Sequence, residues 1–277
     1  MNTLAHFFDP TLERLYTQQL TDGPIIWKNN SVELRHLFYQ LNQAEPQHII
    51  MPKAYNFIQH KLKQVEQNYA AAIIPGYSVD KLTSLQVAKI SPLAERLCTQ
   101  DSVSTWVKQT TAILLTQPCW LQNISPSAAS QTLTSIQLME LYLRLTQQDQ
   151  NGIELAQSYQ SMLLATGTKI PSLHSYSFSQ QSELIPEILE FASLQLALFR
   201  FPRVLLPEIL GFTLAYCQLP TPIEVCFPKH KLPGPFFQQR QRILEQQLTP
   251  LRQCITAYLD LFPQRIQILW LRIQNGF

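Results

Sequence analysis

The most informative stretch of this chain runs from Arg200 to Cys217 and reads RFPRVLLPEILGFTLAYC. Pro202 fixes its own φ angle and favours a helix start, and Pro207 is expected to interrupt or kink the following turns. Gly211 has no side chain, so another backbone can approach the helix closely at that point. The stretch therefore predicts a buried, kinked core helix.

The same stretch contains one carboxylate, that of Glu208, among leucine and isoleucine residues. A carboxylate is costly to bury unless a cation pairs with it or a metal ion binds it. Composition and periodicity assign Glu208 no chemistry beyond this need for a partner.

Outside this stretch, apolar residues recur at helical spacing along most of the chain. Ser31 is expected to cap the second predicted helix, and Gly167 is expected to close the helix that precedes it. The predicted helices cover residues 8–20, 31–45, 52–71, 79–99, 101–116, 126–148, 154–166, 183–199, 202–217, 236–262 and 263–277. Their apolar faces include Leu34, Leu37, Phe38 and Leu41, then Tyr55, Ile58, Leu62 and Val65, and then Leu133, Ile136, Leu138, Leu141, Tyr142 and Leu145.

Signals for β-strands are weak: no apolar–polar alternation is sustained, and only seven glycines occur in 277 residues. Many helices joined by short breaks predict an all-α bundle. We expect N-terminal helices over residues 1–115 to pack on a helical core over residues 116–277, as one compact unit. Residues 172–182 and the proline-rich stretch from Pro220 to Pro235 are expected to be loops.

Composition places the chain among globular proteins, because 45% of its residues are hydrophobic and 14% are charged. The net charge of +2 gives no reason to expect nucleic acid as a partner. The sequence shows no secretion signal and no apolar run of about 20 residues, so we expect a cytoplasmic protein without membrane contact. Five separated cysteines without a Cys-x-x-Cys pair are expected to be reduced. The small share of charged residues is compatible with a large face covered by a partner.

Familiar catalytic motifs are absent from the sequence. No Gly-x-Ser-x-Gly, His-Glu-x-x-His or Gly-x-Gly-x-x-Gly occurs, and the six histidines are scattered. Glu187 and Glu190, three residues apart, could share a helix face, but no Glu-x-x-His motif lies near them. Motifs alone therefore point to no reaction.

Three stretches, in order along the chain, resemble the iron-containing redox enzymes of the haem-oxygenase-like di-iron oxidase superfamily. They are CWLQN at Cys119–Asn123, the segment from Tyr142 through Asn151-Gly152 to Gly167, and FPRVLLPEILG at Phe201–Gly211 followed by Leu214-Ala215. The resemblance covers roughly residues 115–220 and implies a haem-oxygenase-like, up-and-down multi-helix bundle.

The resemblance also implies which positions would hold iron in an active member of the family. Carboxylates and imidazoles bind Fe(II) and leave positions open for O₂. Gln148, Leu155 and Cys217 stand where the family's Glu, His and second Glu are expected. No histidine follows His230 to supply the family's later Asp and His pair.

In the pattern of this family, Glu208 is a structural residue rather than an iron ligand. The resemblance implies that a neighbouring arginine, such as Arg200 or Arg203, holds its carboxylate. We therefore assign structural roles to Arg203, Glu208 and Gly211.

Three hypotheses for the function remain open. In the first, the chain is a haem-oxygenase-like protein that has lost its metal site, binds no cofactor, and acts as a scaffold or partner subunit in a homodimer or with another protein. In the second, it is an active non-haem di-iron, O₂-dependent oxidase with relocated ligands. In the third, the bundle binds an apolar small molecule. The candidate ligands for the second hypothesis are Glu140, Asp149, Glu154, His174, Glu187 and Glu190.

Overall fold

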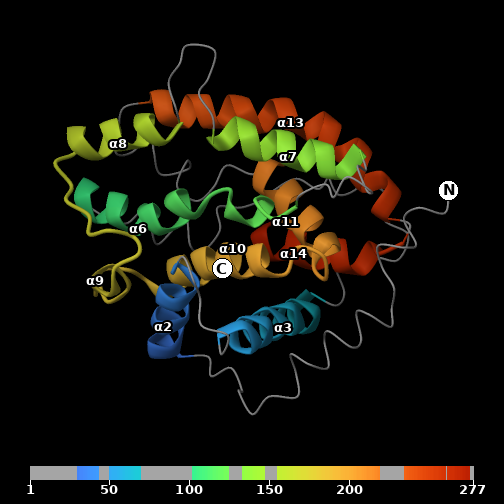
Figure 1. Cartoon of the computed structure of the whole chain (residues 1–277), viewed down its shortest axis with the longest axis horizontal. Helices are drawn as coiled ribbons and strands as arrows, with labels where there is room; N and C mark the ends of the chain where they lie inside the picture. The colour runs from blue at the N-terminus through green and yellow to red at the C-terminus, as the bar shows by residue number, and fades with distance from the viewer. Residues whose placement is uncertain are drawn as a thin grey trace.

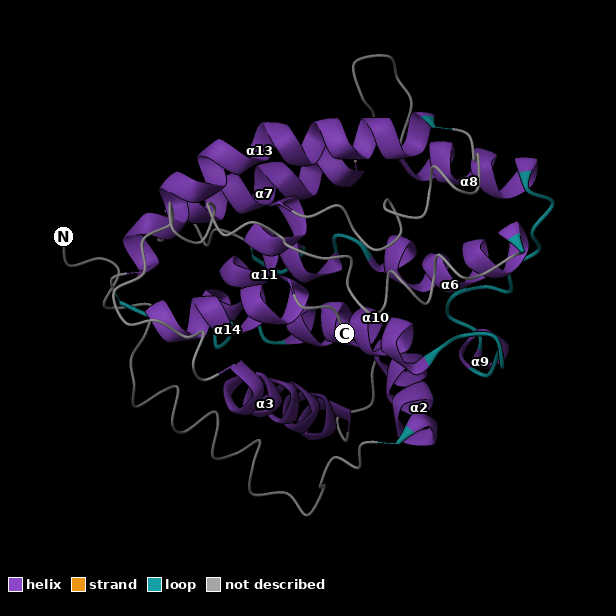
Figure 2. Ribbon diagram, turned by 180° about the vertical axis from the view of Figure 1, so that it is seen from behind, coloured by secondary structure: helices purple, strands orange, loops and turns teal. Residues whose placement is uncertain are grey.

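The computed structural model describes residues 30–43, 50–69, 102–124, 133–146, 155–218, 234–259 and 261–274. Within those ranges the chain is all-α and has no strand, which confirms the predicted fold class (Figures 1 and 2). The predicted helices over residues 8–20 and 79–99 lie outside the described residues, as does most of the proline-rich stretch. The described elements are α2 (Ser31–Leu41), α3 (Ile50–Tyr69), α6 (Val103–Thr116), the 3-10 helix η3 (Cys119–Leu121), α7 (Leu133–Thr146), α8 (Leu155–Ala165), α9 (Tyr176–Ser179), α10 (Pro186–Arg200), α11 (Leu206–Gln218), α13 (Pro235–Leu259) and α14 (Pro263–Gln274).

The helices form three layers in the view of Figure 1, with α7, α8 and α13 above, and α2 and α3 below. α6, α10, α11 and α14 lie between them. α13 contacts α7, α8 and α11, whereas α10 contacts α2, α3 and α6. The most extensive packing between described helices joins α11 to α14. These contacts place α10, α11 and α14 at the centre of the bundle.

α11 is buried on all sides, as the apolar stretch predicts. Every residue from Leu206 to Cys217 is buried, which is typical of a central helix. The expected start at Pro202 and the expected kink at Pro207 are wrong, because residues 201–205 form turns and the helix begins at Leu206. Pro207 therefore lies in the first turn, where its missing N–H group costs no helical hydrogen bond.

α2 and α3 have the amphipathic faces that the sequence predicts. The predicted faces of both helices, led by Leu34 and Tyr55, are buried at every predicted position. The expected cap at Ser31 is wrong by one residue, because Asn30 is the N-cap and its Oδ1 accepts a hydrogen bond from the Glu33 N–H at 2.8 Å. Asn and Ser are both good N-caps, so the sequence pattern does not separate them.

The apolar stripe predicted for α7 is narrower in the structure. Leu138, Leu141 and Leu145 are buried, whereas the side chains of Leu133 and Ile136 are 61% and 45% exposed. The helical spacing therefore identified the buried face correctly in the C-terminal half of α7 and failed at its N-terminal end.

Two connections also differ in how well they were predicted. Gly167 has a φ of 62°, and the N–H of Thr168 donates to the Leu163 carbonyl at 3.2 Å, so the glycine closes α8 as predicted. Residues 172–182 are not entirely a loop, because they contain α9, which Ser175 caps.

The helix predicted over residues 236–262 is α13, which runs from Pro235 to Leu259 with Pro250 inside it.

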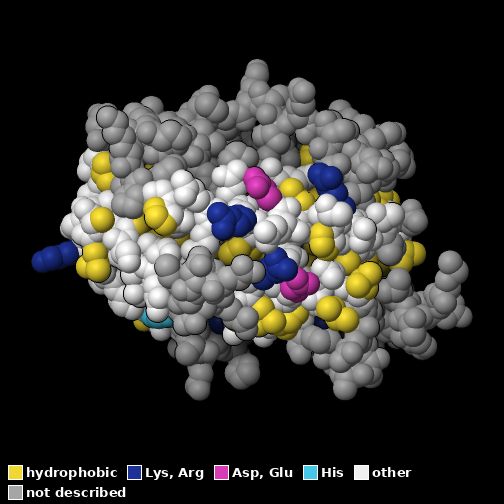
Figure 3. Space-filling model, turned by 90° about the horizontal axis from the view of Figure 1, so that it is seen from above, with side chains coloured by type: hydrophobic (Ala, Val, Ile, Leu, Met, Phe, Trp, Pro, Cys, Tyr) yellow, Lys and Arg dark blue, Asp and Glu magenta, His cyan; other side chains and the backbone are white. Residues whose placement is uncertain are grey.

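The surface seen in Figure 3 carries few charged side chains among its described residues, and apolar side chains are scattered between neutral polar ones. This agrees with the 14% of charged residues in the whole sequence. None of the described helices combines the length and the hydropathy that a membrane span requires.

Candidate functional site

Glu140, one of the six candidate ligands, lies on α7 and bonds to protein groups. Its Oε1 accepts from Arg144 Nη2 at 2.8 Å, one helical turn away, and from Gln247 Nε2 of α13 at 3.4 Å. Arg144 also donates to Gln246 of α13 at 3.0 Å. The carboxylate therefore takes part in the packing of α7 on α13.

Glu190 lies on α10 and is bonded by two cations from other helices. Lys61 Nζ of α3 lies 2.7 Å from Glu190 Oε2, and Arg272 Nη2 of α14 pairs with Oε1. The side chains are largely buried, with exposed fractions of 3% for Lys61 and 13% for Glu190 and Arg272. Burial lowers the pKa of Lys61, and Glu190 opposes that shift. Because both carboxylate oxygens hold a cation, Glu190 is poorly suited to bind a metal ion.

His174 lies in the segment before α9 and bonds to α2. Its Nδ1 donates to the backbone carbonyl of Asn42 at 2.6 Å, and the Asn42 side chain donates back to the Leu173 carbonyl at 2.6 Å. These two bonds fix the segment against the C-terminal end of α2. A structural hydrogen bond therefore accounts for this histidine.

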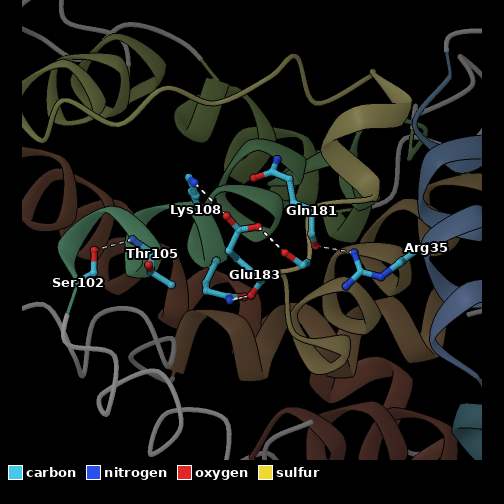
Figure 4. Close-up of polar contacts among 8 residues, drawn as sticks. Arg35, Ser102, Thr105, Lys108, Gln181 and Glu183 are labelled. Atoms are coloured by element: carbon cyan, nitrogen blue, oxygen red, sulfur yellow. Dashed lines mark hydrogen bonds and ion pairs between the residues drawn. The ribbon is translucent and has the colours of Figure 1, made fainter.

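The chain between α9 and α10, shortly before Glu187, is held by side chains of α2 and α6 (Figure 4). Arg35 donates to the carbonyls of Ser179 and Gln181 at 2.7 Å and to that of Leu184 at 2.8 Å. Lys108 pairs with Glu183 at 3.3 Å. The Arg35 side chain satisfies three backbone carbonyls. Together with the Lys108–Glu183 ion pair, these bonds account for the polar side chains here without a ligand.

The structure does not bring the described candidate ligands together into one site. Glu187 and Glu190 lie three residues apart on α10, but Glu140 belongs to α7 and His174 to the segment beside α2. In the part of the chain that the structure describes, no three His, Cys, Asp or Glu side chains are grouped so that they could hold a metal ion. Asp149 and Glu154 lie outside the described residues.

Two of the positions at which the resemblance expects ligands are buried and carry poor donors. Leu155, the first residue of α8, has no ligand atom and is 2% exposed. Cys217 is 5% exposed, and burial raises the pKa of its thiol to about 12, although the positive charge of Arg240 opposes this. Since the thiolate is the form that binds metals, this thiol is a weak ligand near neutral pH. Gln148 lies outside the described residues.

Arg240 is a wholly buried cation that sequence reasoning missed. It lies on α13, is 0% exposed, and donates from Nε to Gln117 Oε1 at 3.0 Å. Its guanidinium carbon lies 4.7 Å from the centre of the Tyr216 ring, and the Tyr216 hydroxyl donates to the same Gln117 oxygen. One signal was present in the sequence: Arg240 is spaced four residues from Phe236 and from Leu244, which places it on the apolar face of α13.

Glu208 finds its partner on α14. Arg265 Nε and Nη2 lie 2.6 Å and 2.9 Å from the two carboxylate oxygens. Arg265 was not expected in this role, for which the resemblance suggested Arg200 or Arg203; Arg200 donates to the carbonyl of Leu41, and Arg203 is exposed. The sequence suggested the near arginines because they lie within one or two turns, whereas the fold brings in a distant one.

Gly211 lies where α11 and α14 approach each other. A Cβ added at this residue would overlap the Ile266 carbonyl group, with 2.8 Å to its carbon. The close approach expected at this glycine is therefore made by α14, and a larger residue would push the two helices apart.

The CWLQN stretch also packs against α11. Trp120 Nε1 donates to Thr213 Oγ1 at 3.1 Å, and the indole ring meets the rings of Phe212 and Tyr216 edge-on at 4.9 Å and 4.7 Å. The CWLQN stretch therefore packs on the part of α11 that directly follows Gly211, and the contact is structural.

No family model, curated protein or solved structure matches this chain. The relation to the haem-oxygenase-like oxidases therefore stays a prediction from the three sequence stretches.

Proposed function

We propose that this chain is a haem-oxygenase-like helical protein related to non-haem iron oxidases, that it lacks their iron site, and that it acts as a scaffold or partner subunit. The observation that carries the proposal is the buried Arg240, whose guanidinium lies over the ring of Tyr216, the residue that precedes Cys217 on α11. A fixed positive charge repels a divalent cation strongly in a buried environment.

The residues that the structure describes do not fit a di-iron centre. Such a centre needs carboxylate and imidazole ligands that converge on the metal. Leu155 offers no donor atom, and the Cys217 thiol is protonated near neutral pH. Three candidate ligands already bond to protein groups in separate parts of the fold: Glu140 to Arg144, His174 to the Asn42 carbonyl, and Glu190 to Lys61. No catalytic step through iron follows from this arrangement.

The scaffold role is supported by what the resembling stretches do in the fold. Trp120 binds Thr213, Gly211 admits α14, and Glu208 pairs with Arg265. Each of these contacts holds two elements together. The residues that match the family pattern thus hold the helices together, whereas the expected ligand positions carry residues that bind iron poorly.

The proposal also includes a binding partner for this chain. We place the protein in the cytoplasm and expect it to form a homodimer or to bind another protein. The low share of charged residues supports a covered face, and the side chains of Leu133 and Ile136 are among the exposed apolar ones.

The partner role is tested by the mass of the purified chain in solution over a wide concentration range. A mass that rises toward twice the chain mass of 31.9 kDa supports a homodimer. A constant single-chain mass contradicts the homodimer.

The oxidase alternative is tested by optical spectra after O₂ is added to protein treated with Fe(II), where a transient absorption band would contradict the loss of the iron site.

A further inference from the structure

α7 packs on the bundle through one of its sides. Leu138, Leu141 and Leu145 are buried, and the helix contacts α13, α8 and η3. In Figures 1 and 2, α7 lies beside α13 in one outer layer of the molecule, so its other side faces away from the core. A helix in such a position normally carries polar side chains on its outward side.

The outward side of α7 is apolar instead. Leu133, Ile136 and Leu143 are 61%, 45% and 37% exposed. Ile136 and Leu143 are seven residues apart, which is about two helical turns, so they lie in line along the helix. Met139 lies between them on the same side and is partly exposed. We call these four side chains the α7 stripe, and a helix that is apolar on two opposite sides is typical of one that is covered on both.

The charges on α7 do not oppose contact with an identical helix. Between Leu133 and Thr146, the only charged residues are Glu140 and Arg144, which form an ion pair with 2.8 Å between Arg144 Nη2 and Glu140 Oε1. Both side chains also bond to glutamines of α13, which holds the pair toward that neighbouring helix. Two copies of α7 can therefore meet without net repulsion between like charges, whereas a strongly acidic or basic partner would find no opposite charge to recognise.

The positions of the apolar side chains suit a two-fold arrangement. The midpoint of α7 lies between Met139 and Glu140, and Ile136 and Leu143 are equally far from it along the helix. A two-fold axis brings the same patch of both chains together, so the patch must be complementary to itself. With the axis at the midpoint and the two helices antiparallel, Ile136 of each copy lies opposite Leu143 of the other.

We propose that the α7 stripe docks on the α7 stripe of a second copy of this chain, with the two helices antiparallel about their midpoints. The inference rests on the proposed function and deepens it, because it names the partner and the surface. A contact made mainly by one helix of 14 residues is small beside the roughly 800 Å² that each partner buries in a standard interface. We therefore expect a dimer that dissociates on dilution.

Sedimentation equilibrium of the full chain over a wide concentration range tests the surface. Ile136→Asp and Leu143→Asp each place a carboxylate in the stripe at an exposed position, and each should raise the dissociation constant of the dimer at least about tenfold. Leu164→Asp is the matched control, because Leu164 is 82% exposed on α8 and lies outside the stripe, and it should leave the dimer unchanged. Circular dichroism checks that each variant is folded, and Ile136→Gln and Leu143→Gln replace any aspartate variant that is not.

Mixing two variants tests the antiparallel arrangement. Ile136→Lys and Leu143→Glu should each weaken the dimer alone, and a mixture of the two should restore it, because the new opposite charges then face each other. A mixture of Ile136→Lys and Ile136→Glu should stay dissociated. Restoration by the second mixture alone would overturn the arrangement, since it would place each residue 136 opposite residue 136 of the other copy.

The remaining outcomes separate this inference from the proposed function. A dimer that withstands the stripe substitutions as well as it withstands Leu164→Asp would overturn the inference and leave a homodimer through another surface. A mass of 31.9 kDa at every concentration would overturn it and leave a different protein as the occupant of the stripe. Iron retained by the unmodified protein would instead contradict the proposed loss of the iron site, whatever the state of the dimer.

Discussion

Glu208 and Arg265 form a two-bond ion pair that joins the first turn of α11 to the first turn of α14. Nε lies 2.6 Å from Oε1, and Nη2 lies 2.9 Å from Oε2. Arg265 Nη2 also donates to the Val204 carbonyl at 2.6 Å. The Glu208 side chain is 4% exposed, whereas that of Arg265 is 26% exposed. The pair fixes the two helices in the region where Gly211 allows them to approach.

Replacing Glu208 with Gln should lower the free energy of unfolding by about 2–3 kcal/mol, because it removes a charge partner from a partly buried arginine. Urea unfolding measures this change. Arg203→Gln is the control, since Arg203 is exposed, and it should change the free energy by less than about 0.5 kcal/mol. Equal effects of the two substitutions would contradict the structural role of Glu208.

Gly211→Ala should destabilise the protein by about 3 kcal/mol, because the added Cβ overlaps the Ile266 carbonyl and forces α11 and α14 apart. Gly167→Asn is the matched control at a glycine whose φ of 62° suits asparagine and whose Cβ direction is open. We expect that control to stay within about 0.5 kcal/mol of the unmodified protein. A harmless Gly211→Ala would mean that the two helices are not as close as described.

Glu190→Gln should destabilise more than Lys61→Met. The first change leaves Lys61 and Arg272 without their shared carboxylate, at an expected loss of about 3 kcal/mol. The second leaves Glu190 still paired with Arg272, so we expect a change within about 1 kcal/mol. Chemical denaturation of both variants provides the measurement, and the reverse order would rule out the shared-carboxylate arrangement.

The lowered pKa of Lys61 predicts a pH dependence of stability. Burial is the main cause of the shift, and the ordinary pKa is 10.5. Between the folded and unfolded pKa values, the unfolded chain binds more protons, so the contribution of Lys61 to the free energy of unfolding rises with pH. The free energy of unfolding of the unmodified protein, minus that of Lys61→Met, should therefore increase as the pH rises toward the ordinary lysine pKa of 10.5. A difference that falls over this range would refute a lowered pKa.

Local patterns in the sequence predicted most of the described helices. The spacing of apolar residues identified the buried faces of α2 and α3 completely, because that spacing follows directly from helical geometry. The glycine at position 167 correctly predicted the end of α8, because glycine readily adopts the left-handed backbone conformation found there. The start of α11 was misplaced because Pro202 and Pro207 both suit a first helical turn, and only the tertiary structure selects between them.

The candidate site was much less predictable, since its contacts join residues far apart in the sequence. Arg265 lies 57 residues after Glu208, and Arg240 lies 123 residues after Gln117. Periodicity places a side chain on a face, but it does not say which side chain it meets across the bundle. Arg240 was detectable only as an arginine on an apolar face, and its partners were not.

The proposed loss of the iron site is tested most directly by the iron content of the purified protein after anaerobic incubation with Fe(II) and removal of unbound metal. We predict that the protein retains iron far below one ion per chain, because a leucine, Leu155, and the protonated thiol of Cys217 stand where ligands are expected. Retention close to one or two ions per chain, followed by a transient absorption band on exposure to O₂, would contradict this prediction and favour an active oxidase with relocated ligands.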